Sequence, residues 1–388
     1  MLFRSALPFK GTDRPADNKK KAYACTLSWL RKLVEKNPTF LKNWVAVFAQ
    51  MRDWGFFEKV PAEDLDNPNV HYISTLPVAQ PHKPHHPVRL VMQANQLTEN
   101  QLTLNQCLHQ GETLLSNLIL TVIKFRSYRY ALILDLSRMY HRIHLTVPSQ
   151  NYCRFYALVD KDGEIKVEEW RSRTLPFGLV CSPNIACFVL KEHAKKYFED
   201  PKLGPASKVL MDQTYMDDVC VLSNEESQLP ELVSDVKFIL SEANFPVGKF
   251  ISNSQSTLDS FPELVLPDQE NVSMLGTRWC PKQDIITFNF VPSPLTSEGP
   301  GAKITKRKLL SCLAKTFDPM GFLAPWSLKA KIILQKTWID KIPWDTPLQD
   351  ELLSEATQFL SELEGLQEFS LPRSFLKNSG SQENGLRE

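Results

Sequence analysis

The spacing of apolar residues predicts that the chain begins with two helices. Between residues 17 and 36 apolar side chains recur at helical spacing, while Lys and Arg occupy the other face. Asn37 and Pro38 predict the end of this helix and the start of another, because Asn caps helices and Pro suits the first helical turn. The second apolar stripe continues to Met51. Residues 1–70 are therefore expected to form a basic, helical lead-in.

From Tyr72 onward the pattern changes to short strands. Residues 72–78 and 88–92 predict a hairpin joined by a proline-rich, cationic loop. Residues 130–136 are almost entirely apolar and predict a buried strand, yet this strand ends in Asp135. A carboxylate at the end of a core strand is costly unless something pairs with it, so Asp135 is a candidate functional residue.

A second acidic feature lies in residues 211–222, where apolar residues flank Asp217 and Asp218. This pattern predicts a β-hairpin with acid at its tip. Adjacent carboxylates repel each other, and a site that keeps both ionised usually supplies a divalent cation. The alternative is an exposed turn, because Asp is a favoured turn residue.

Helices and turns fill the remaining pattern. Residues 114–126 predict a helix with apolar residues on one side. Residues 143–159 alternate like a returning strand pair, with a turn at 160–163. Ser182 as N-cap with Pro183 predicts a helix to about Phe198, with Phe188 among the residues expected on its buried side. Further on, the pattern predicts the following elements: an amphipathic helix at 229–243, a hairpin at 273–279 and 284–288, a linker at 292–302, basic helices from Thr305 and over 326–338, an acidic helix at 348–366, and a disordered tail.

Composition places the chain among folded proteins with a polyanionic partner. Its 388 residues suit two or three subdomains, with 43% hydrophobic and 23% charged residues. The net charge of +1 hides two basic zones, at 1–60 and 301–338, and an acidic zone at 341–388. The eight cysteines form no Cys-x-x-Cys pair and predict reduced thiols in an intracellular protein. Neither a signal peptide nor a membrane span is expected.

Three carboxylates on strands suggest one chemistry. Asp135, Asp217 and Asp218 suit two-metal nucleotidyl transfer, in which one ion activates a primer 3′-hydroxyl and the other holds a triphosphate. We expect Asp135 and Asp217 to bridge two Mg²⁺ ions, with Mn²⁺ as a substitute, and Asp218 to lie closer to one of them. The cations of the predicted hairpin, Lys83 and Arg89, suit phosphate oxygens.

Four motifs in this order resemble the reverse transcriptases, and more narrowly those of BEL/Pao retrotransposons. They occupy residues 135–140, 175–183, 215–218 and 305–325, and the resemblance runs from about residue 8 to Arg373. It implies an α+β, right-hand polymerase with an antiparallel palm sheet and a helical thumb. The implied fingers and palm together span residues 71–290, with the fingers around 70–130 and 143–180 and the palm at 131–142 and 181–290. The implied thumb lies at 303–340, and an acidic connection helix with a tail lies at 341–388.

The resemblance also implies roles for single residues. Tyr140 is similar to the steric gate that excludes a ribose 2′-hydroxyl, and Arg89 to the fingers cation above the incoming nucleotide. The residues implied to bind the nucleotide are Lys83, Arg89, Tyr140, Phe177, Gly178 and Met216. Those implied to bind template and primer are Lys249, the primer-grip residues Met274, Leu275 and Gly276, and the thumb residues Lys306, Arg307 and Lys308.

The expected function is RNA-directed DNA synthesis from dNTPs on a template-primer, in the cytoplasm, associated with particles, or in the nucleus. Gln93 stands where relatives commonly have Asp, and Phe177 replaces the Gln of retroviral enzymes. The chain is expected to stop where an RNase H domain would begin. Two alternatives stay open: a catalytically decayed or co-opted nucleic-acid-binding fragment, and an RNA-dependent RNA polymerase, against which Tyr140 speaks.

Overall fold

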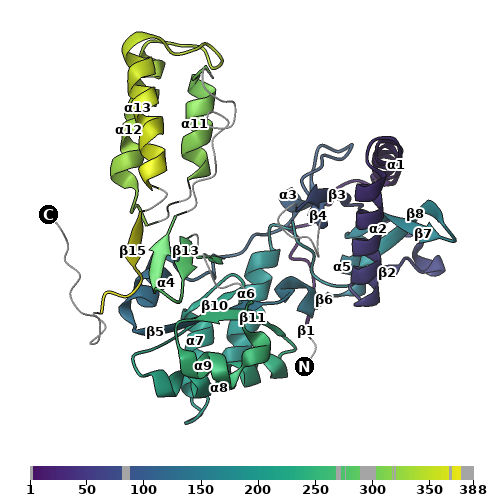
Figure 1. Cartoon of the computed structure of the whole chain (residues 1–388). Coiled ribbons are helices and arrows are strands. Elements are labelled where there is room, and N and C mark those ends of the chain that lie inside the picture. Colours follow the sequence, from purple (N-terminus) through teal and green to yellow (C-terminus); the bar gives the residue numbers. More distant parts are fainter. Residues whose placement is uncertain are drawn as a thin grey trace. The chain divides into compact units, whose positions relative to one another are not determined.

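The structure, a computed structural model, divides the chain into two compact units (Figure 1). Unit 1 comprises residues 1–115, 136–211 and 235–247, and unit 2 comprises 116–135, 212–234 and 248–388. The residues that the structure describes are 3–80, 88–267, 272–275, 277–288, 303–316, 318, 320–366 and 369–376.

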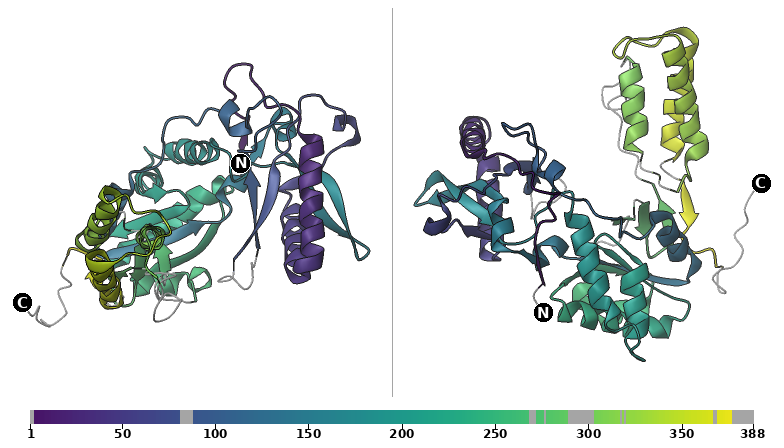
Figure 2. Two further views of the ribbon diagram at one scale, coloured as in Figure 1. Left: turned by 90° about the horizontal axis from the view of Figure 1, so that it is seen from above. Right: turned by 180° about the vertical axis from the view of Figure 1, so that it is seen from behind.

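Two helices open unit 1 as the apolar spacing predicts. They are α1 (Lys19–Lys36) and α2 (Pro38–Asp53). The predicted capping is confirmed, since the Asn37 side chain accepts a hydrogen bond from the backbone N–H of Phe40 and Pro38 starts α2. Both views of Figure 2 show α1 and α2 beside strands of unit 1, and α1 contacts β7 (Arg154–Lys161) and β8 (Glu164–Ser172).

Three small sheets complete the strands of unit 1. An antiparallel sheet has the order β2-β8-β7, a hairpin joins β3 to β4, and β1 pairs in parallel with β6. The predicted turn between β7 and β8 is confirmed, with positive φ at Asp162 and Gly163. The strand bounds are β1 Phe3–Ser5, β2 Phe57–Lys59, β3 Ser74–Ala79, β4 Val88–Gln93, β6 Ile143–Leu145, β7 Arg154–Lys161 and β8 Glu164–Ser172.

The remaining helices of this part differ from expectation at several points. The helix α5 (Val147–Asn151) interrupts the region where alternation predicted continuous strands. At the start of α6 (Ser182–Lys195) the N-cap is Cys181, because the Ser182 hydroxyl donates to the carbonyl of Pro176 instead of capping. The other helices are α3 Leu104–Cys107, α7 Gly204–Asp212 and α8 Leu229–Glu242, of which residues 235–242 belong to this unit, with short 3₁₀ turns at Ala62–Asp64 and Met139–Arg142. Two further 3₁₀ turns, Glu226–Gln228 and Pro262–Leu264, belong to unit 2.

Helical spacing alone misplaced some apolar side chains. Phe188 was expected on the buried side of α6 but is 55% exposed. The buried side of α6 is formed by small residues such as Ala186 and Ala194, together with Leu190 and His193. Small side chains allow closer packing, so the apolar residue with the largest surface ends on the solvent side.

Unit 2 is built on an antiparallel sheet with the order β11-β5-β10-β9. Its core includes Ile133, Cys220, Ile251 and Trp279, against which α4 packs. The bounds are α4 Leu118–Ser127, β5 Tyr130–Leu136, β9 Thr214–Tyr215, β10 Asp218–Ser223, β11 Val247–Ser252 and α9 Gln255–Ser260. The helix α4 begins at Leu118, four residues later than predicted, because the side chain of Asn117 caps it.

A second sheet in unit 2 is larger than the predicted hairpin. It has the order β12-β13-β14-β15, with a strand from near the C-terminus as its edge. Arg373 follows that strand, and its buried guanidinium forms an ion pair with Asp284 and donates to the carbonyl of Phe125. The bounds are β12 Val272–Met274, β13 Thr277–Cys280, β14 Ile285–Thr287 and β15 Ser370–Pro372.

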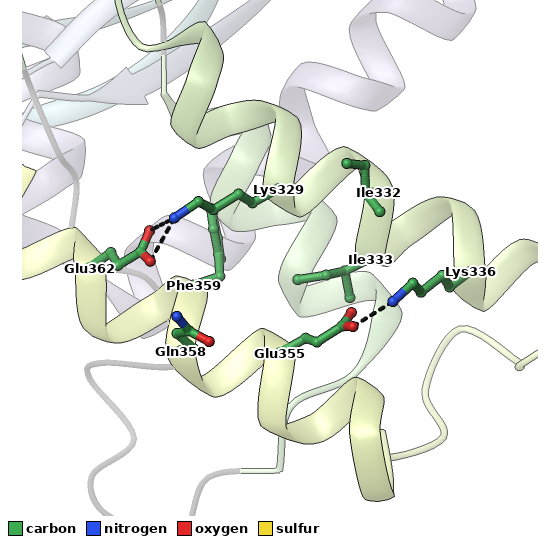
Figure 3. A pocket seen from close by; sticks show the side chains of 8 residues that line it. All are labelled: Lys329, Ile332, Ile333, Lys336, Glu355, Gln358, Phe359 and Glu362. Atoms are coloured by element: carbon green, nitrogen blue, oxygen red, sulfur yellow. Dashed lines mark hydrogen bonds and ion pairs between the residues drawn. The ribbon is translucent and has the colours of Figure 1, made fainter.

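Three helices form a bundle in unit 2: α11 (Lys306–Lys315), α12 (Ala324–Ile339) and α13 (Asp350–Leu366). The acidic helix expected at 348–366 packs on α12, with Phe359 in a core shared with helices α11 and α12. Figure 3 shows two ion pairs between α12 and α13, Lys329–Glu362 and Lys336–Glu355. The predicted linker at 292–302 and the predicted disordered tail lie largely outside the described residues.

Two findings concern the chain as a whole. Within the described residues, no helix is both long and apolar enough to cross a membrane. The eight cysteines are free thiols, and all but Cys25 are buried.

Candidate active site

The hairpin of the acidic motif presents its carboxylates beside the end of β5. Asp218 is the first residue of β10 and pairs with Asp135 across the antiparallel sheet. Met216, at φ 54°, and Asp217 form the turn that joins β9 to β10. The predicted acidic hairpin is therefore present, and Asp135 reaches it because β5 and β10 are neighbours. All three carboxylates belong to unit 2.

The electrostatics of this cluster are repulsive. Burial, followed by the negative charge of Asp217 and then that of Asp135, raises the pKa of Asp218 to about 7. The backbone N–H of Leu275 donates to Asp218 Oδ2 at 3.5 Å, which works in the opposite direction. An ionised cluster of this kind is stabilised by a positive charge placed among the oxygens.

We expect the burial of Asp218, together with the repulsion from Asp217 and Asp135, to make stability depend on pH in the presence of EDTA. Because the pKa of Asp218 rises from 3.8 to about 7, the folded protein holds a proton over that range which the unfolded chain has released. The free energy of unfolding should therefore fall as pH rises from 3.8 to 7. Asp218→Asn should lose this component of the dependence. Urea unfolding of both proteins at several pH values measures it, and identical pH profiles would contradict the assignment.

The donor set fits a divalent cation by its chemistry. Three carboxylates supply hard oxygen ligands, which Mg²⁺ and Mn²⁺ prefer, and their repulsion favours a bound cation. Within the described part of the chain, no group of three or more His, Cys, Asp or Glu side chains is arranged to hold a metal ion. The side chains of Asp135 and Asp217 are exposed. The strands thus place the ligands on neighbouring positions without assembling a coordination sphere.

The predicted primer grip touches the carboxylate cluster through its backbone. Leu275 has φ 44° and is 4% exposed, and its side chain packs in the core with Cys220 and Trp279. Only its backbone is therefore available to a ligand, and the N–H already reaches Asp218. Met274 ends β12, and Gly276 lies outside the described residues.

A second cluster of predicted residues lies in unit 1. The ring of Phe177 is 4.5 Å from that of Tyr140, centroid to centroid, and the guanidinium carbon of Arg89 lies 5.2 Å from the Phe177 centroid. The predicted nucleotide residues Arg89, Tyr140 and Phe177 are thus in mutual contact through one aromatic ring. Lys83 lies outside the described residues, and Met216 belongs to the turn in unit 2.

Gly178 is fixed by close backbone packing. It has φ +100°, and a Cβ added there would lie 2.0 Å from the carbonyl oxygen of Met92 in β4. The Asn105 side chain holds the same turn, donating to the carbonyl of Gly178 at 3.0 Å and accepting from the N–H of Val180 at 2.9 Å. This packing sets the position of Phe177, the preceding residue.

Two further residues of this cluster are not predicted by any pattern in the sequence. Asn105 bridges to the turn from α3, and His141 is a buried ring stacked 4.4 Å from Phe56. Burial lowers the pKa of His141 to about 3, so the ring is neutral, and its Nδ1 lies 2.9 Å from Thr174 Oγ1. No local pattern marks either residue, because their roles depend on partners more than 30 positions away in the chain.

The predicted nucleic-acid-binding cations already have contacts inside the protein. Lys306 is only 2% exposed, with its Nζ 3.3 Å from the ring centroid of Trp338. Arg307 forms two hydrogen bonds to Asp345, at 2.7 and 3.0 Å. The Nζ of Lys249 donates to the carbonyl of Glu263. Lys308 lies in the first turn of α11, where its backbone N–H donates to the side chain of the N-cap residue Thr305.

Two family matches and one solved structure bear on this arrangement. Residues 85–276 match the family described as reverse transcriptase (RNA-dependent DNA polymerase), and residues 305–387 match the Pao retrotransposon-like RNaseH-like domain. A foamy viral protease-reverse transcriptase, solved in complex with double-stranded DNA, has a similar fold, with TM-score 0.52 and 15% sequence identity. The similarity covers 81% of this chain and 46% of that one. A search of curated proteins gave no match.

Residues 85–276 therefore carry a domain of the reverse transcriptase (RNA-dependent DNA polymerase) family, and the fold of the chain is similar to that of a reverse transcriptase. More narrowly, the two matches together agree with the resemblance to the reverse transcriptases of the Pao retrotransposon type. The resemblance to reverse transcriptases and the α+β polymerase fold, both expected from the motifs, are confirmed. Reverse transcriptases generally use divalent metal ions. The second family's description names an RNaseH-like domain where the motifs implied the thumb, and the described residues there form the bundle α11 to α13 and β15.

Proposed function

We propose that this chain catalyses dNTP addition to a primer on an RNA or DNA template, with Asp135, Asp217 and Asp218 as the catalytic carboxylates. The observation that carries the proposal is the pairing of Asp218 with Asp135 on neighbouring strands, beside a turn that carries Asp217. The raised pKa of Asp218 supports it, because three carboxylates that repel each other form a site whose charge a cation completes.

The proposed cofactor is a pair of Mg²⁺ ions, which Mn²⁺ can replace. When bound, such ions lower the pKa of the primer 3′-hydroxyl and neutralise charge on the triphosphate and the departing pyrophosphate. Asp135 and Asp217 would hold both ions, and Asp218 would hold one of them. The Leu275 N–H bond keeps Asp218 oriented as the carboxylate is ionised.

The proposed nucleotide pocket uses the Phe177 cluster of unit 1. Arg89, stacked above Phe177, suits the triphosphate, and Phe177 and Gly178 line the base and sugar. Lys83 and Met216 keep their proposed roles beside the nucleotide. The proposed template and primer contacts are Lys249, the turn Met274 to Gly276, and the cations Lys306, Arg307 and Lys308, of which Lys306 would act mainly by positioning Trp338 and Trp344.

Tyr140 is the proposed gate against ribonucleotides. Its ring is held by Phe177, so it offers a fixed wall to a 2′-hydroxyl. We expect Tyr140→Ala to reduce the preference for dNTP over rNTP by about 10²-fold, the order of discrimination that a pocket wall gives against one added hydroxyl. Tyr140→Phe keeps the ring and should keep the preference. Single-nucleotide incorporation with dCTP and CTP measures both, and an unchanged preference in Tyr140→Ala would rule out the gate.

The decisive test of the proposed function is dNTP incorporation by the purified protein on a primed RNA, with and without Mg²⁺. Extension that needs the metal supports polymerisation. Salt-dependent binding of the template-primer with no extension supports the alternative, a catalytically decayed or co-opted nucleic-acid-binding protein. That alternative rests on Gln93, which stands where relatives of the family commonly have Asp.

A further inference from the structure

The helix α1 carries a one-sided charge that the proposed active site does not use. Its 18 residues include six Lys and Arg and a single acid, Glu35. Solvated helix faces usually interleave both signs, which limits self-repulsion and adds small stabilising pairs. A helix with this imbalance instead presents a positive surface.

Four of these cations share one exposed face, here called the α1 basic face. It consists of Lys20, Lys21, Arg31 and Lys32, all exposed. At about 100° per residue the four side chains lie within about 120° around the helix axis. Lys20 and Lys21 form one pair and Arg31 and Lys32 the other, about 16 Å further along the helix. The buried side of α1, which includes Leu33, points the other way, toward the body of unit 1. Figure 1 shows α1 at the edge of this unit.

The first turn of α1 places positive charge where the helix disfavours it. Cations near a helix N-terminus oppose the macrodipole by about 0.3 to 1 kcal/mol each. The first turn itself contains no acid, and the Asn18 side chain bonds the backbone of Tyr72 rather than capping α1. Asp17, just before the helix, accepts a hydrogen bond from the backbone N–H of Lys19 at 2.8 Å. Lys19 is compensated by an ion pair with Glu169 at 3.1 Å.

No such compensation exists for the α1 basic face within the described residues. None of its four cations forms an ion pair with a carboxylate there, and Lys21 donates only to the carbonyl of Leu97, at 3.0 Å. The charge of Lys20 and Lys21 in the first turn therefore opposes the helix dipole without an ion-pair partner in the part of the chain that the structure describes, and Asp17 ahead of the helix offsets it only in part. An anion from outside would offset the rest.

Exposed aromatic rings flank these cations, one beyond each edge of the α1 basic face. Trp29 and Tyr23 are both exposed, and the Nζ of Lys32 lies 5.8 Å from the Trp29 ring centroid. Tyr23 is held from below by an edge contact with Tyr156, at 5.2 Å. Surfaces that bind single-stranded nucleic acid combine cations for the phosphates with aromatic rings for the bases.

We infer that the α1 basic face binds the phosphodiester backbone of a single nucleic-acid strand. The inference rests on the proposed function only in taking nucleic acid as the partner. It adds a contact in the N-terminal helix to those proposed for Lys249 and the bundle. The two cation pairs, about 16 Å apart, would engage phosphates a few nucleotides apart on one strand.

The test is the salt dependence of binding for the variant Lys20→Gln, Lys21→Gln, Arg31→Gln and Lys32→Gln. Affinity for a fluorescein-labelled single-stranded RNA is measured by anisotropy between about 50 and 200 mM KCl, without Mg²⁺ or dNTP. Each phosphate contact on a single strand contributes about 0.7 to the slope of log K against log salt. The variant's slope should therefore be smaller in magnitude by about 2 to 3.

A matched variant removes four exposed lysines from α6, α7 and the connection between them: Lys195→Gln, Lys196→Gln, Lys202→Gln and Lys208→Gln. Its slope should stay within about 1 of the wild-type value. An unchanged slope in the α1 variant, or an equal loss in the matched variant, overturns the inference. The inference is also overturned if the α1 variant loses binding to a polyglutamate peptide while its salt dependence of RNA binding is unchanged. That result would identify an acidic protein as the partner.

Two further readouts separate this inference from folding and from the proposed function. Thermal unfolding should show the α1 variant at least as stable as wild type, because the disfavoured first-turn cations are gone. A clear loss of stability would contradict the electrostatic argument. The binding measurement involves no chemistry, so a wild-type protein that fails to extend a primer still reports on α1. In that case the proposed function fails while the basic face is tested independently.

Discussion

Asp217→Asn is expected to abolish primer extension while leaving the protein folded. The substitution keeps the shape of the side chain but removes one of the charges on which the proposed metal site depends. A metal ion supplies several kcal/mol of transition-state stabilisation in such reactions, and about 4 kcal/mol corresponds to a rate loss of about 10³-fold. Steady-state extension of a primed RNA with saturating dNTP measures the loss.

The control for this substitution is Asp212→Asn, which removes an exposed carboxylate at the end of α7, five residues earlier. Its extension rate should stay within about twofold of wild type, because surface substitutions away from a site have small effects. Thermal unfolding of Asp217→Asn should match or exceed wild type, since one source of repulsion on Asp218 is removed. Extension by Asp217→Asn at a rate near wild type would refute the assignment of the carboxylates.

Gly178→Ala should damage both stability and nucleotide use. The residue has φ +100°, where an L side chain is strained, and the added Cβ would lie 2.0 Å from a backbone oxygen in β4. The turn must move, and Phe177 moves with it. We expect a loss of at least about 2 kcal/mol in the free energy of unfolding. The value of kcat/KM for dNTP should fall by about 10²-fold, as expected for a reacting group misplaced by about 1 Å.

Gly163→Ala is the matched control, because Gly163 has a similar φ of +85° but no atom lies within 4 Å of the added Cβ. It should cost only the backbone strain, about 1 kcal/mol, with kcat/KM unchanged. Urea unfolding and single-nucleotide incorporation on both variants separate strain from collision. Equal effects of the two substitutions would show that the contact with Met92 does not matter.

Much of the active site could be predicted from short stretches of sequence. An apolar strand that ends in Asp135 and a hairpin that carries Asp217 and Asp218 are local patterns, and the structure contains both elements. The proposed gate Tyr140 follows Asp135 by five residues, so the same motif includes both. Local patterns of this kind reflect the preferences of neighbouring residues, which sequence alone carries.

Other features needed partners distant in the chain. The bond from the Leu275 N–H to Asp218, and the hold of Asn105 on the Gly178 turn, join residues 57 and 73 positions apart. The strand β15 completes a sheet with β14, and the acidic helix α13 joins a bundle with α11 and α12. Ser182 was expected to cap α6 but bonds Pro176 instead, because the buried carbonyl of Pro176 needs a donor.

By itself the sequence indicated the kind of protein through the resemblance of its motifs to a known family. It also determined the strand-and-hairpin carboxylates and most helix bounds, because capping residues and apolar periodicity act over a few positions. Only the tertiary structure decided that Asp135 faces Asp218, that Lys306 is buried against Trp338, and that the α1 cations lack carboxylate partners among the described residues. Burial and charge compensation depend on which distant segments meet, and that is set by packing of the whole unit.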